Sequence, residues 1–203
     1  MGPLRGPPCG VAPCSSSRVF GRSWQIDVSD ELDRLEAQIR GAFQDTPPPD
    51  PGGLRGSDEG DEPLLLEAEF RRVPDWRQVD VAFIDQAPDG FGSALAFFSD
   101  AALRYYLPAY LLADLKGRLQ QASPVFHLWH GLVDEQRDQP VNERRYGSWT
   151  WFEAVSDRFR GLAPAEVSAI VAYLQYKAEH DELGVDRPLI EQALRNFWLA
   201  RRE

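Results

Sequence analysis

Cysteine and histidine, the residues that most often bind metals or form disulfides, are scarce in this chain. Its 203 residues include two cysteines and three histidines. Both cysteines, Cys9 and Cys14, lie within the first 14 residues, ahead of any pattern typical of folded structure. A disulfide framework and a four-ligand zinc site are therefore unsupported, and a reducing compartment, the cytoplasm, is the expected location.

The chain also lacks a surplus of positive charge and a membrane-length apolar run. Its 22 basic residues are outnumbered by 32 acidic ones, so the formal net charge is −10. Nonspecific binding of nucleic acid or of an anionic membrane needs clustered Lys and Arg, and we predict neither. The most apolar segment, residues 97–117, contains Arg104 and is too short to span a bilayer. Such acidity still permits a basic protein as a partner.

The composition is typical of a folded domain that also has an irregular N-terminal tail and an irregular internal loop. Apolar residues make up 43% of it and six are tryptophans, which is typical of a folded protein. Residues 1–23 are rich in Gly, Pro, Ser and Arg, and they predict a disordered tail ahead of a helical domain at 24–203. Residues 44–62 predict an acidic Pro/Gly-rich loop, in which six acids against Arg55 leave a charge of −5. We interpret this loop as a solvated linker.

The segment from Phe97 to Gly117 is the one around which the chain is organised. Ser99 is a good N-cap and Gly117 a usual C-terminal stop, so a helix is predicted between them. Its apolar side chains lie on opposite faces, which means that other helices must enclose it. Pro108 removes a backbone donor inside the helix, and we expect a kink or a break there.

Other helices follow from apolar residues that recur at steps of three and four. They are predicted over residues 29–43, 63–72, 164–178 and 186–198, the last with Asp186 as N-cap. A further helix is predicted to follow the aromatic cluster Trp149, Trp151 and Phe152 and to end near Phe159.

Shorter segments are less regular. Residues 75–79 predict a short helix or turn anchored by Trp76, and residues 81–84 fit either a strand or a helix. A loop is predicted at 87–93, a helix interrupted near Pro124 within 118–133, and a surface loop at 134–145. Together these elements predict an all-α, single-domain irregular bundle of about six or seven helices around a proline-kinked central helix.

No catalytic signature is present. The spacing of His127, His130 and Asp134 could place three metal ligands along one helical face, but the pattern fits an ordinary amphipathic element better. His180 lies at a predicted helix end, where the dipole favours a cation. There is no nucleophile elbow and no glycine-rich phosphate loop. We therefore predict no catalytic residue, no metal and no cofactor.

The polar residues of the central helix are the weak candidates for a binding site. Arg104 and Asp114 lie on the helix expected to be most buried, where a charge must be paired. One interpretation is structural: Arg104 bridges to a carboxylate or to carbonyls, and Asp114 caps a helix or accepts a tyrosine hydroxyl. The other makes Arg104, Tyr106 and Tyr110 the lining of a pocket for an anionic or aromatic ligand.

The block FFSDAALRYYLPAYLL at residues 97–112 resembles the hallmark of an uncharacterised bacterial family, in which the phrase is close to F-L-T-P-E-A-F-R-Y-Y-L-P-A-Y-L-L. Weaker similarity covers residues 32–49, 75–79 and 162–166. This chain departs from the family at Ser99-Asp100, where Thr-Pro is common, and at Trp149 to Phe152. The resemblance implies a shared fold and no known activity.

Two functions stay open. The first is a noncatalytic interaction protein: a small acidic cytoplasmic adaptor, regulator or immunity-like factor that binds another protein. The alternative is an enzyme or small-molecule binder whose site is assembled around Arg104.

Overall fold

All regular structure in the described part of the chain is helical. The computed structural model describes residue 2 and residues 28–50, 52–86 and 94–202, so the predicted tail at 1–23 and the predicted loop at 87–93 lie almost wholly outside it. The longer helices are α1 (Val28–Ala42), α2 (Glu62–Phe70), α5 (Asp100–Leu115), α8 (Trp151–Arg158), α9 (Pro164–Glu179) and α10 (Arg187–Ala193). The all-α prediction is confirmed.

Short helices raise the number above the six or seven predicted. They are α3 (Val81–Gln86), α4 (Ala94–Phe97), α6 (Pro124–Trp129) and α7 (Glu143–Tyr146), with the 3₁₀ turn η1 (Trp76–Gln78). A helix of four to six residues makes fewer than two turns, too few for an apolar period to be recognised. Residues 81–84, ambiguous in the sequence, are thereby helical.

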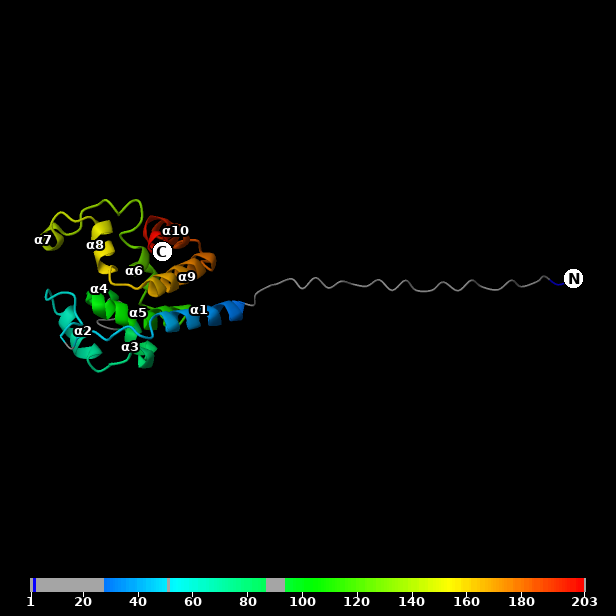
Figure 1. Cartoon of the computed structure of the whole chain (residues 1–203), viewed down its shortest axis with the longest axis horizontal. Coiled ribbons are helices and arrows are strands. Elements are labelled where there is room, and N and C mark those ends of the chain that lie inside the picture. The colour runs from blue at the N-terminus through cyan, green and yellow to red at the C-terminus, as the bar shows by residue number, and fades with distance from the viewer. Residues whose placement is uncertain (1, 3–27, 51, 87–93, 203) are drawn as a thin grey trace.

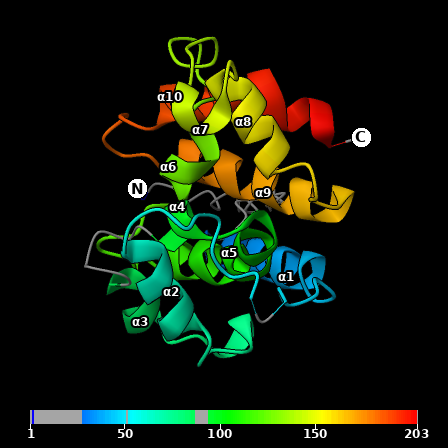
Figure 2. The ribbon, with the colours of Figure 1, turned by 90° about the vertical axis from the view of Figure 1, so that its left-hand side faces the viewer.

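The helices form two groups that face each other. Figures 1 and 2 show α1 to α5 on one side of the molecule and α6 to α10 on the other. Contacts of α1 with α9, and of α5 and α4 with α6, join the groups. One continuous hydrophobic core runs through both, from Phe43 in the first group to Trp198 in the second.

Helix α5 lies within that core, as predicted. Leu107 and Leu111 on one face and Tyr105 and Leu112 on the other are all buried. The helix continues through Pro108 without a break. Packing on both faces compensates for the hydrogen bond that proline removes.

Both ends of α5 have the predicted caps. The hydroxyl of Ser99 accepts a hydrogen bond from the backbone N–H of Ala102 at 3.1 Å. At the other end Gly117 adopts a φ of +62°, and the N–H groups of Gly117 and Arg118 donate to the carbonyls of Asp114 and Ala113. This is the Schellman arrangement, which satisfies the last carbonyls of a helix and favours glycine.

One predicted boundary was wrong, and one predicted cap differs in its side chain. Pro124 begins α6 instead of interrupting a longer helix, because proline fits the first turn, where its missing N–H is not needed. Asp186 occupies the N-cap position of α10, as predicted, but its side chain makes no capping hydrogen bond. Asp181 accepts from the N–H groups of Asp186 and Arg187 instead, both at 2.8 Å. After α10 the chain continues as a π-helical turn at Leu194–Trp198 and a 3₁₀ turn at Leu199–Arg201.

The acidic loop is irregular, as predicted, but it is anchored rather than fully solvated. Its acidic side chains are exposed, whereas Leu54 and Thr46 are buried. The carbonyl of Leu54 accepts from Ser99 N at 2.9 Å, and Gly56 N donates to Phe97 O at 2.8 Å. The loop is thereby fixed to the start of α5.

Candidate functional site

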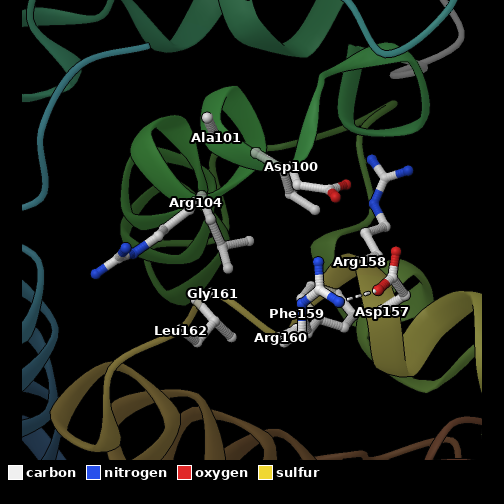
Figure 3. Close-up of a pocket in the computed structure, with 11 residues that line it drawn as sticks. Asp100, Ala101, Arg104, Asp157, Arg158, Phe159, Arg160, Gly161 and Leu162 are labelled. Carbon is white, nitrogen blue, oxygen red and sulfur yellow. Dashed lines mark ion pairs between the residues drawn. The ribbon is translucent and has the colours of Figure 1, made fainter.

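A cavity opens between the first two turns of α5 and the C-terminal end of α8. It has a volume of about 270 Å³, and the side chains of Leu103, Leu107, Phe159 and Leu162 make its lining largely apolar. Figure 3 shows the residues of α5 along one side and the segment from Asp157 to Leu162 along the other.

Charged groups stand around this apolar lining. Arg160 forms an ion pair with Asp157 at 2.9 Å and is 80% exposed. The guanidinium of Arg158 donates to the carbonyl of Leu95 at 2.6 Å, so it joins α8 to α4. Desolvation raises the pKa of Asp100, although the nearby cation of Arg158 acts in the opposite direction.

A second cavity adjoins the first. Its volume is about 350 Å³, and it shares Asp100, Asp157 and Arg158 with the first cavity. Trp149, which is 41% exposed, and Trp151 line it from one side, and Gly56 of the acidic loop lines it as well. We call the two cavities together the α5–α8 cleft.

Local sequence signals fix the walls of the cleft. Thr150 and Glu153 form a capping box at the start of α8: Glu153 N donates to Thr150 Oγ1 at 3.3 Å, and Thr150 N donates to Glu153 Oε2 at 2.8 Å. Gly56 approaches the other wall so closely that a Cβ at this position would lie 2.7 Å from Phe98 O. Only glycine fits there without a shift of the backbone.

Arg104 lines the cleft, but its guanidinium pairs with a carboxylate outside it. Figure 3 shows its guanidinium turned away from Asp157 and Arg160. Its Nε lies 2.8 Å from Oε2 of Glu166, a carboxylate that is 1% exposed at the start of α9. Glu166 also accepts from Thr46 Oγ1 at 2.6 Å and from Ala163 N at 2.7 Å. The carboxylate partner of the structural interpretation is therefore present.

Asp114, near the C-terminal end of α5, makes a similar connection to α9. Its carboxylate accepts from the hydroxyl of Tyr173 at 2.5 Å and pairs with Lys177 at 2.9 Å. Both partners belong to α9. Arg104 and Asp114 thus link α5 to α9 at the junction between the two groups of helices.

The two candidate tyrosines lie apart from the cleft. Tyr106 donates to the carbonyl of Val73 at 2.6 Å, and burial raises its pKa to about 12. Tyr110 is fully buried, and its hydroxyl has no hydrogen-bond partner among the described residues. Neither lines the cavity beside Arg104, so the predicted set of Arg104, Tyr106 and Tyr110 does not form one pocket there.

His127 and His130 belong to an aromatic cluster around Phe126. His130 stacks on Phe126 with ring centroids 4.7 Å apart and packs edge-on against Trp151 at the same distance. Asp134 lies beyond the end of α6 and accepts from Asn196 Nδ2 at 2.8 Å. Among the residues that the structure describes, no three His, Cys, Asp or Glu side chains are placed to hold a metal ion.

Sequence reasoning missed most of the cleft. It singled out the tryptophan-rich stretch that follows residue 148 and the arginine at 104, but not Asp100, Asp157, Arg158 and Arg160 as neighbours. Asp100 lies more than 50 positions before the other three, and no local spacing brings it to them. In the described ranges, no helix combines the length and apolarity that crossing a bilayer requires.

Comparison with known proteins gives one result. The model of a family of unknown function, DUF6714, matches residues 31–202. This match agrees with the resemblance to an uncharacterised family inferred from residues 97–112. No curated protein and no solved structure shows significant similarity to the chain.

Proposed function

The chain belongs to the family of unknown function DUF6714, whose membership assigns no activity, and we propose that it acts by noncatalytic binding of another protein. It would be a small acidic adaptor, regulator or immunity-like factor of the bacterial cytoplasm. The α5–α8 cleft is the binding surface, and the ligand is a short segment of the partner that combines an apolar side chain with basic residues.

The observation that carries this proposal is the pair of adjoining cavities. The first has an apolar lining beside α5, and the second, which shares three residues with it, is lined by Trp149 and Trp151. Exposed Trp and charged rims around an apolar centre are typical of sites at which proteins bind one another. The first cavity, at about 270 Å³, is large enough to accept an apolar side chain.

The acidity of the chain outside the cleft lining supports a basic partner. The exposed acids of the loop at 44–62 lie on the segment that borders the cleft at Gly56, and the chain as a whole carries −10. Of the three arginines beside the cleft, Arg104 is bound to Glu166, Arg160 to Asp157, and Arg158 to a carbonyl. Complementary charge raises the association rate and excludes acidic competitors.

The alternative, an enzyme or small-molecule site around Arg104, stays a prediction without a specific observation in its favour. Arg104 directs its guanidinium to Glu166, and the two tyrosines proposed with it do not line the same cavity.

Filling the cleft tests the proposal. Ala101 is exposed on α5 and lines the first cavity, so Ala101→Trp obstructs it without removing a buried contact. We expect peptides selected on the wild-type protein from a random library to combine Lys or Arg with a large apolar residue, and to lose at least about tenfold in affinity for the variant.

Ala37→Trp, an equal change on an exposed site of α1, is the matched control and should bind these peptides normally. The same pair of variants is then compared in capture from native lysate. Peptides without basic residues, or peptides that bind the Ala101→Trp variant as well as the wild type, would contradict the proposal.

A further inference from the structure

A small pocket on the other side of α5 is surrounded by positive charge. It has a volume of about 170 Å³ and lies between the end of α1, the turn η1, helix α3 and the C-terminal half of α5. Four cationic residues line it and no acidic residue does: Arg40, Arg77, Lys116 and Arg118. In a chain of net charge −10 this concentration of cations is unusual.

Two of these cations have partners. Lys116 pairs with Glu36 at 2.9 Å, and Arg77 pairs with Asp75 at 3.1 Å. Arg77 also lies with its Cζ 5.0 Å from the centre of the Trp76 ring, which fixes its guanidinium above the indole.

The side chains of Arg40 and Arg118 have no hydrogen-bond or ion-pair partner among the described residues, and both are exposed. Arg40 lies in the last turn of α1, and Arg118 follows the Lys116 C-cap and Gly117 at the end of α5. A helix C-terminus favours a cation, which accounts for each arginine separately. This preference does not explain why the ends of two different helices place their arginines around the same pocket.

A buried donor lies in the same wall. Trp76 is 2% exposed, and its indole Nε1 has no hydrogen-bond partner among the described residues. Burying a donor without an acceptor is costly.

We infer that this pocket binds an oxyanion of the size of phosphate, held by Arg40 and Arg118 with Lys116 and Arg77 adding charge. The volume is below the range that encloses drug-sized ligands, so a small ion or the terminal phosphate of a larger molecule is the ligand that fits. Arginine binds phosphate with two parallel N–H donors, and a tetrahedral anion accepts from several directions at once.

Titration of the full chain tests the site. Inorganic phosphate, phenyl phosphate and acetate are added separately at constant ionic strength, with binding followed by calorimetry and by the indole N–H resonance of Trp76, assigned with Trp76→Phe. We expect saturable binding of phosphate, a shift of that resonance, and no comparable effect of acetate. Equal affinity for phenyl phosphate would indicate a terminal phosphate group as the natural ligand, and weaker affinity the free ion.

The variant Arg40→Gln/Arg118→Gln should bind phosphate at least about tenfold more weakly, because each arginine supplies charge-assisted hydrogen bonds. Arg72→Gln/Arg202→Gln removes the same charge from two exposed positions outside the pocket and is the control. All four positions are exposed, so both variants should fold, which circular dichroism checks. No saturable binding to the wild type, or equal weakening in the control, would refute the inference.

Discussion

At the scale of single residues, Glu166 joins three distant parts of the chain. It accepts from Thr46 in the acidic loop and from Ala163 before α9, and it pairs with Arg104 on α5. A buried carboxylate is stable only when such donors surround it. The residue therefore stabilises the junction between the two groups of helices.

Replacing Glu166 with Gln should destabilise the fold by about 2–3 kcal/mol. Removal of one member of a buried ion pair costs about 3–5 kcal/mol, and the 31% exposure of Arg104 lets water restore part of that. Urea unfolding followed by circular dichroism measures the change. Glu59→Gln, which removes the same charge from the exposed loop, should stay within about 0.5 kcal/mol of the wild type; an equal loss in both variants would contradict the role of the buried pair.

What could be predicted at this scale was local. The caps at Ser99 and Gly117 depend on residues one to four positions away, and both are confirmed. Thr46 and Glu166 are 120 positions apart, and nothing in the sequence around either one indicates the other. The predicted pairing of Arg104 with a carboxylate was correct in kind, because burial demands a partner, but the partner itself could not be named.

At the scale of elements, the long helices were predictable because their apolar period extends over several turns. The short ones depend on tertiary contacts. Helix α3 is an example: it is tied to the connection between α5 and α6 by Asp85, whose carboxylate accepts from the N–H groups of Gln120, Gln121 and Ala122 at 2.8 to 3.0 Å. A side chain that satisfies three backbone donors on a remote loop leaves no pattern in its own neighbourhood.

Asp85→Ala should therefore destabilise the protein by about 1–3 kcal/mol at pH 7. Desolvation acts to raise the pKa of Asp85, but the three backbone donors outweigh it and the pKa is lowered. A lowered folded-state pKa contributes stability above the unfolded value of about 3.9 and loses it as the pH falls through the folded value. The difference between wild type and variant in urea unfolding should thus shrink below about pH 4.

Asp138→Ala is the control for Asp85→Ala, because the side chain of Asp138 is 86% exposed and its ion pair with Arg137 is long, at 3.7 Å. It should change the unfolding free energy little at either pH. A difference for Asp85→Ala that stays constant down to pH 2 would show that the charge of Asp85 does not carry the effect.

At the scale of the whole molecule, the architecture follows from one buried helix and its neighbours. Two groups of helices meet along α5, α1 and α9, and the polar contacts of Arg104 and Asp114 cross that junction. The cleft and the basic pocket lie on different sides of α5, so a ligand in one leaves the other accessible. The apolar content of α5 was enough to predict its burial, but the placement of both sites depends on how the second group packs.

The response of the whole fold to acid should be governed first by two partly buried histidines, His127 and His130. Burial, with the charge of Arg158 and the neighbouring His130 adding to it, lowers the pKa of His127 to about 4, and burial also lowers the pKa of His130. In the unfolded chain a histidine binds its proton near pH 6.5. Between these values the unfolded state binds more protons, so stability falls as the pH drops from about 6.5 towards 4.

For His127 alone the loss between pH 7 and pH 5 amounts to about 2 kcal/mol. The carboxyls of Asp100 and Asp186, whose pKa values desolvation raises, act in the opposite direction, so the contribution of His127 is measured by comparing the slopes of the wild type and of a His127 variant. Urea unfolding at pH 7, 6 and 5 measures the slope, and His127→Gln should reduce it. Because slopes are compared, a variant that is less stable at every pH still tests the assignment, and an unchanged slope would place the acid sensitivity in other groups.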